Sequence, residues 1–143
     1  MSFLRPRIQA RLDGMVARAQ QLTVQVSSPE MATRPETIGP LQKELGVLLR
    51  TTGRYEEYRR LVKLRRSSEA LARGGFRYVH VGADALAYLR ETKEERLLCL
   101  AARAPHEPIA VPFAGLETVY GDDAVDGVLP SHGPAFHVWR VVS

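Results

Sequence analysis

Apolar residues in the first part of the chain recur every three or four positions, the spacing of one face of an α-helix. The first series comprises Ile8, Leu12, Met15, Ala19, Leu22 and Val26. It predicts an amphipathic helix with Pro6 in its first turn, where the missing amide hydrogen would have no partner. Ser28 and Pro29 are expected to end this helix.

A second periodic series predicts another long helix. It comprises Leu41, Leu45, Leu48, Thr52, Tyr55, Tyr58 and Val62. The prolines before it predict a chain reversal with one short helical turn, and residues 33–36 (TRPE) match a capping box. Gly53 marks a kink or a break, while Gly74 and Gly75 are expected to stop the helical region by the C-terminal glycine mechanism. Because each helix has one apolar stripe, we expect the two to form an antiparallel hairpin.

After Gly75 the period falls to two, which is typical of β-strands. The expected strands are 76–81, 85–90, 96–102, 109–113, 116–120 and 134–142, separated by turn-forming residues. Strand 96–102 is almost wholly apolar and is therefore placed centrally. The pattern predicts an α+β fold: a helical hairpin over residues 1–73, then a small antiparallel β-sandwich or curled sheet over residues 74–143.

Composition and charge indicate a globular protein with one modest core. The chain has 143 residues, 45% hydrophobic and 25% charged, with a net charge of +4. Residues 1–72 carry +6 and the remainder −2, so only the first part favours phosphate-bearing partners. The single cysteine, Cys99, cannot form an internal disulfide, and neither a secretory signal nor a membrane span is visible. We therefore expect a cytoplasmic protein.

From Tyr55 onward the sequence carries an ordered set of motifs. They are LVKLRR at 61–66, EAL at 69–71, ALAYLR at 85–90, the central apolar strand and LPSHGP at 129–134. Together they resemble the end of the α-amylase family of glycoside hydrolases, over residues 55–143. The resemblance implies a last barrel helix leading into a C-terminal antiparallel β-domain. The family's catalytic aspartate and glutamate residues belong to its barrel, so none is carried over and we expect no enzymatic activity.

Residues 4–61 resemble the N-terminal helical domain of bacterial peptide chain release factors. The stretches that carry this resemblance are VSSPE at 26–30, PE at 35–36, LQKEL at 41–45 and YEEYRRL at 55–61. It implies a helical arm that contributes to ribosome contact in translation. The sequence contains no Gly-Gly-Gln, the motif that this family uses for hydrolysis.

The two resemblances overlap at residues 55–61, which suggests a splice of two unrelated segments. Three origins are compatible with this overlap. The chain could be a natural recombinant, a built chimera, or an amylase-type domain whose barrel contacts are replaced by a helical hairpin. We favour the last, because a helical layer could cover apolar surface that faced the barrel. The helices could also pair between two chains, which predicts a candidate homodimer.

Histidines and acidic residues are the candidates for metal chemistry. His80, His106, His132 and His137 match no compact ligand motif, so structural or surface roles are expected. Asp122, Asp123 and Asp126 lack the ordered pattern of a calcium loop and are interpreted as a solvated turn. We predict no metal and no cofactor.

Three further features of the sequence are candidates for a functional role. Cys99 lies in an apolar strand and is expected to be buried rather than nucleophilic. Trp139 is a candidate sugar platform, although a packing role on the last strand is favoured and carbohydrate binding is not expected. Five basic residues of the second predicted helix form what we call the basic cluster: Arg59, Arg60, Lys63, Arg65 and Arg66. This cluster is a candidate contact for phosphate or RNA. The alternative is that its side chains form ion pairs with nearby glutamates.

Overall fold

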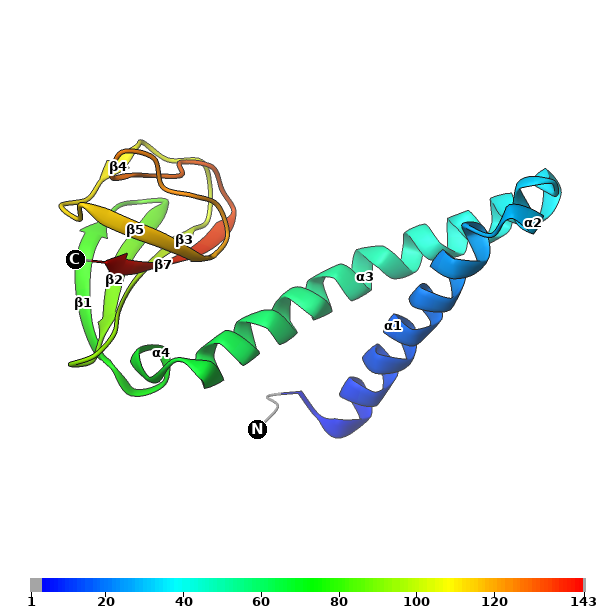
Figure 1. Ribbon diagram of the computed structural model, residues 1–143, viewed down its shortest axis with the longest axis horizontal. Helices are drawn as coiled ribbons and strands as arrows, with labels where there is room; N and C mark the ends of the chain where they lie inside the picture. Colours follow the sequence, from blue (N-terminus) through cyan, green and yellow to red (C-terminus); the bar gives the residue numbers. More distant parts are fainter. Residues whose placement is uncertain (1–3, 143) are drawn as a thin grey trace. The chain divides into compact units, whose positions relative to one another are not determined.

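The computed structural model describes residues 4–142 of the chain (Figure 1). The outer ends of the two predicted domains lie outside the described residues, namely Met1, Ser2 and Phe3 at the start and Ser143 at the end. Helices come first and an antiparallel sheet follows, which confirms the predicted α+β class. Two compact units are present, one ending at Val62 and one beginning at Lys63. Within residues 4–142, none of the helices has both the length and the apolar character needed to cross a bilayer.

Three helices begin the chain: α1 (Pro6–Val26), α2 (Pro29–Ala32) and α3 (Pro35–Ser67). Helix α3 runs through Gly53 without a break, so the predicted alternative of two segments is wrong. The predicted capping box is also wrong. Thr33 ends α2, where its hydroxyl donates a hydrogen bond of 2.8 Å to the carbonyl of Glu30, and the first turn of α3 instead bonds to the carbonyl of Arg34.

Helices α1 and α3 form an antiparallel pair in the first unit. The Tyr55 hydroxyl of α3 donates to Asp13 of α1 at 2.8 Å, and further along the pair Arg18 bonds to Glu44 at 2.8 Å. The contacting residues advance along α1 from Asp13 to Arg18, whereas they go back along α3 from Tyr55 to Glu44. This order confirms the antiparallel hairpin. The buried side chains of this unit are Val16, Ala19, Leu22, Thr52 and Tyr55. Ile8 belongs to the predicted stripe but is 48% exposed.

The second unit contains a five-stranded antiparallel sheet in the order β1-β2-β3-β7-β5. Its strands are β1 (Gly75–Val81), β2 (Ala85–Glu91), β3 (Arg96–Ala102), β5 (Gly115–Tyr120) and β7 (Ala135–Val142). Strand β3 is central, as its apolar sequence predicts. A second small sheet pairs β4 (Ile109–Ala110) with β6 (Val128–Leu129), so the strand predicted at 109–113 is shorter than expected and β6 was missed.

Each face of the sheet has its own buried cluster. One face carries Leu89, Leu98, Leu100 and Trp139, packed with residues of the small sheet. The opposite face carries Leu97, Cys99 and Val138, packed against Ala70 and Leu71 of helix α4 (Glu69–Arg73). Residues within the second unit therefore fill both faces of its sheet.

Helix α4 is held to the sheet by polar contacts at both of its ends. The Ser68 hydroxyl accepts the amide hydrogen of Leu71 at 3.1 Å and donates to Glu95 at 2.7 Å. At the other end, the Arg90 guanidinium of β2 donates to the carbonyls of Ala70 and Leu71, at 3.2 and 3.4 Å. These contacts satisfy groups that a short helix leaves open.

Gly74 ends α4, but the predicted left-handed glycine mechanism is wrong. Its φ and ψ are −61° and 160°, values that any residue can adopt. Glycine is needed here for space. A Cβ would collide with the Ala70 carbonyl oxygen and would lie 2.9 Å from the Glu91 carbonyl oxygen.

We expect Gly74→Ala to destabilise the second unit by about 1–3 kcal/mol, because backbone on both sides must move to admit the methyl group. The comparison is Gly53→Ala, since a Cβ at Gly53 meets no atom within 4 Å. That variant is expected to be neutral, or more stable by up to about 1 kcal/mol, through helix propensity. Urea unfolding of the two variants checks the difference, and equal midpoints would contradict the steric explanation.

Candidate functional site

The turn after β5 lies against the first residues of β7 and is anchored there by hydrogen bonds. Gly121 has a φ of 87°, and a Cβ at this position would collide with the Nδ1 atom of His137. The next amide, of Asp122, donates to His137 Nδ1 at 2.9 Å. The Asp122 carbonyl accepts from Trp139 Nε1 at 3.0 Å. The backbone of Asp122 is therefore fixed by two side chains of β7.

A second histidine joins this turn from the segment that precedes β7. His132 Nε2 lies 3.2 Å from the Asp122 carboxylate oxygen Oδ2. The ring of His132 meets the ring of His137 edge to face, with centroids 5.3 Å apart, and His137 stacks on Trp139 at 5.5 Å. We call Asp122, His132 and His137 the His–Asp cluster. Asp122 and His132 are exposed, whereas His137 is buried.

Burial decides the protonation of His137. Loss of hydration lowers the pKa of this histidine, outweighing the opposite effect of Asp122, and the nearby His132 and His106 lower it further. The ring is therefore neutral. Since Nδ1 accepts the Asp122 amide hydrogen, the ring proton is assigned to Nε2, a buried atom without a hydrogen-bond partner in the structure.

The other two histidines lie outside the His–Asp cluster. His80 is an exposed residue of β1, and with His106 it lines a surface cavity of about 540 Å³. His106 Nδ1 lies 2.8 Å from the Glu107 carbonyl and so carries the proton, which leaves Nε2 as a buried acceptor without a partner. The sequence offered no signal for these placements, because each depends on long-range strand pairing.

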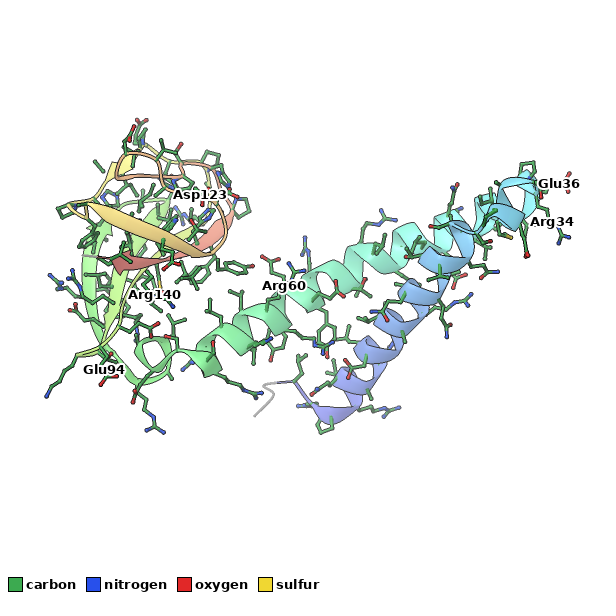
Figure 2. The ribbon with its side chains drawn as sticks, in the orientation of Figure 1. Arg34, Glu36, Arg60, Glu94, Asp123 and Arg140 are labelled. Carbon is green, nitrogen blue, oxygen red and sulfur yellow. The ribbon has the colours of Figure 1, made fainter. Side chains whose placement is uncertain are left out.

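The structure separates the three acidic residues of the 122–126 turn. Asp123, labelled in Figure 2, accepts a hydrogen bond from the Thr118 hydroxyl. Asp126 occupies a left-handed turn position with a φ of 51°. Asp122 alone faces the histidines. Among the described residues, the grouping of potential ligands found here combines one carboxylate with two imidazoles, rather than the three carboxylates considered for calcium.

Trp139 cannot be a sugar platform, so that candidate role is corrected. Its side chain is fully buried, stacked on His137 and hydrogen-bonded to the Asp122 carbonyl. Neither face of the indole is therefore open to a ligand. The exposed aromatic residues of this unit are instead Phe76 and Tyr78 of β1, 47% and 62% exposed, which sequence reasoning did not single out.

Cys99 is buried in β3, opposite Tyr88 of β2. Burial raises the pKa of the Cys99 thiol to about 11, although Tyr88 and Arg90 act in the opposite direction. Burial also raises the pKa of Tyr88 to about 12. The thiol is thus neutral and enclosed, as the sequence predicts.

We expect slow labelling of Cys99 by a maleimide or disulfide reagent at pH 8 in the folded protein. The raised pKa lowers the thiolate fraction by about 100-fold relative to an ordinary cysteine, and burial slows access further. Labelling in denaturant supplies the reference rate. A folded chain that reacts as fast as the denatured chain would show that Cys99 is accessible.

The basic cluster lies on α3, and all five of its side chains are exposed. Figure 2 shows Arg60 projecting from this helix. Arg59 lies 3.9 Å from the Asp13 carboxylate and over the ring of Tyr55, so part of its charge is compensated within the hairpin.

Comparison with protein-family models and with curated proteins finds no match to this chain. Comparison with solved structures finds similarity to MutB, a trehalulose synthase. A MutB variant in complex with glucose has a TM-score of 0.52 and 24% identity, covering 62% of this chain and 18% of that chain. A second MutB variant has a TM-score of 0.50 and 25% identity over the same shares. The monoclinic form of MutB from Pseudomonas mesoacidophila MX-45 has a TM-score of 0.49 and 24% identity, again over the same shares.

These similarities concern the fold. The covered share, 62% of this chain, is consistent with the C-terminal β-domain of an amylase-type enzyme. The chain spans 18% of the length of the MutB chains that it matches. No comparison supports the release-factor resemblance of residues 4–61, which stays a prediction.

Proposed function

We propose that this chain is a non-catalytic protein whose second unit is an amylase-like accessory β-domain with a structural or interaction role. The observation that carries the proposal is the similarity to MutB over 62% of this chain, combined with the absence of any barrel among residues 4–142. In glycoside hydrolases of this type the chemistry needs a pair of acidic residues about the scissile bond. The resemblance assigns those residues to the barrel.

The packing on the two faces of the sheet supports a role in binding a partner rather than in catalysis. Large side chains fill it on both faces, with Trp139, Leu98 and Leu97 fully or almost fully buried. A domain filled in this way leaves its outer surface for partners. The described cavities lie at the surface instead.

The finer part of the proposal concerns the helices. We infer a recombined protein in which the helical segment packs on the accessory domain in place of a barrel. Apolar side chains that remain exposed support this idea, since packing would remove them from water. They are Ile8 and Val47 of the helices and Phe76 and Val81 of β1.

An activity assay tests the proposal. The purified chain is incubated with soluble α-glucan and, separately, with sucrose, and the products are separated by chromatography. We expect neither hydrolysis nor isomerisation above a heat-denatured control. Turnover that disappears in a single-residue variant such as Asp122→Asn, but persists in His80→Ala, would refute a non-catalytic role.

A second candidate function is a ribosome-associated module, and the exposed basic cluster on α3 favours it. Arginine and lysine side chains that neutralise RNA phosphates give binding that weakens steeply with salt. Co-sedimentation with ribosomes at moderate salt tests this function. Binding should be lost in the triple variant of Arg60, Arg65 and Arg66 to alanine and retained in Arg103→Ala, a variant of the β-unit.

We propose that the first unit binds a second copy of this chain, so that the helices form a homodimer. A groove of about 280 Å³ follows the hairpin and is lined by Val16, Ala19, Val24 and Leu49 among others. In a two-fold dimer, the same apolar residues of a second copy would lie against this groove. Solution mass by light scattering should give twice the chain mass, with Leu49→Glu monomeric; a monomeric parent chain would contradict it.

A further inference from the structure

The His–Asp cluster brings three potential metal ligands together: one carboxylate and two imidazoles. One donor atom each from Asp122, His132 and His137 lies within 4.8 Å of the others. The Asp122 Oδ2 to His132 Nε2 distance is 3.2 Å. Two ligands at about 2.0–2.1 Å from a tetrahedral Zn²⁺ lie about 3.3 Å apart, so this pair already has the required separation.

We propose that Asp122, His132 and His137 form a binding site for a divalent transition metal ion of the zinc type. Two imidazole nitrogens and one carboxylate oxygen suit Zn²⁺, whereas Ca²⁺ takes six to eight oxygen ligands. Three protein ligands leave a fourth tetrahedral position open to water or to an external ligand.

The tautomer of His137 identifies its ligating atom. Nδ1 accepts the Asp122 amide hydrogen at 2.9 Å, so Nδ1 carries the in-plane lone pair of the ring and Nε2 holds the proton. A metal ion at the cluster takes over the Nδ1 lone pair and replaces the amide hydrogen bond. His132 binds through Nε2, with its ring proton at Nδ1, where the 59% exposed side chain allows water to accept it.

The surrounding contacts hold two of the three ligands in place. His137 is 3% exposed and is stacked on Trp139. The Trp139 indole bond to the Asp122 carbonyl, 3.0 Å long, fixes the turn that carries the carboxylate. Two adjustments remain: His132 moves from an exposed position, and the Asp122 amide shifts away from His137 Nδ1. Supporting contacts of this kind orient metal ligands and raise affinity.

Zinc titration of the full-length, tag-free chain tests the site. The chain is stripped with a chelator and then titrated with ZnCl₂ in a calorimeter, and the bound metal is counted by mass spectrometry after dialysis. We expect one Zn²⁺ per chain. His132→Ala and Asp122→Asn should each weaken binding by about 10-fold or more. His80→Ala, an exposed histidine of β1 outside the cluster, should bind as the parent does.

Circular dichroism of each variant establishes that it is folded, which is expected because Asp122 and His132 are exposed side chains. Co²⁺ adds a direct readout, since the tetrahedral ion absorbs visible light and the absorption should vanish in His132→Ala. Substoichiometric zinc in the parent chain, equal binding in His132→Ala, or a preference for Ca²⁺ over Zn²⁺ would each overturn the proposal. The contact between Asp122 and His132 would then be a surface contact without a metal.

Discussion

Replacing Trp139 by alanine is expected to lower the free energy of unfolding of the second unit by about 3–5 kcal/mol. The side chain is fully buried in the face of the sheet that carries Leu98 and Leu100. Its removal opens a cavity and leaves the Asp122 carbonyl without the indole donor at 3.0 Å. Both effects act in the same direction.

Thermal and urea unfolding, followed by circular dichroism, measure this loss. Tyr78→Ala is the matched comparison, because it also removes a large aromatic side chain from the sheet but one that is 62% exposed. That variant should lie within about 0.5–1 kcal/mol of the parent. Similar losses for the two variants would mean that Trp139 is not a core residue.

Leu22→Ala is expected to destabilise the helical hairpin by about 2–5 kcal/mol. Leu22 is fully buried, although the unit that contains it has few buried side chains. Trp139 is the only tryptophan and belongs to the second unit, so its fluorescence reports that unit alone. The helical signal should melt at lower temperature while the fluorescence transition changes little.

The control for this experiment is Gln25→Ala, three residues away on the same helix and exposed. It is expected to change the helical transition by no more than about 0.5 kcal/mol. If Leu22→Ala shifted the helical and fluorescence transitions together, the two units would unfold as one, and the independent-unit prediction would fail.

The regular elements could be predicted because their signals are local. The apolar run at 96–102 predicts a central strand, and β3 occupies the same residues between β2 and β7. Apolar spacing likewise predicts α1 and α3. Short elements lack such signals. Strand β6 has two residues and forms only by pairing with β4, while α4 is too short for helical periodicity.

The candidate site could not be assembled from the sequence. His132 and His137 are separated from Asp122 by 10 and 15 positions, and only the pairing of β5 with β7 brings the turn against them. A tryptophan side chain can stack on a sugar or fill a core, and the residue type alone does not predict which of these two roles Trp139 has. Its burial is decided by the register of β7 against β3, where it lies opposite Leu98.

The self-contained nature of the β-domain is the central claim, and the folding of a fragment spanning residues 63–143 tests it most directly. This fragment keeps α4 and all seven strands. We predict a cooperative unfolding transition and the blue-shifted emission of a buried Trp139, as in the full chain. Emission of a solvent-exposed indole without a transition would contradict an independent amylase-like β-domain.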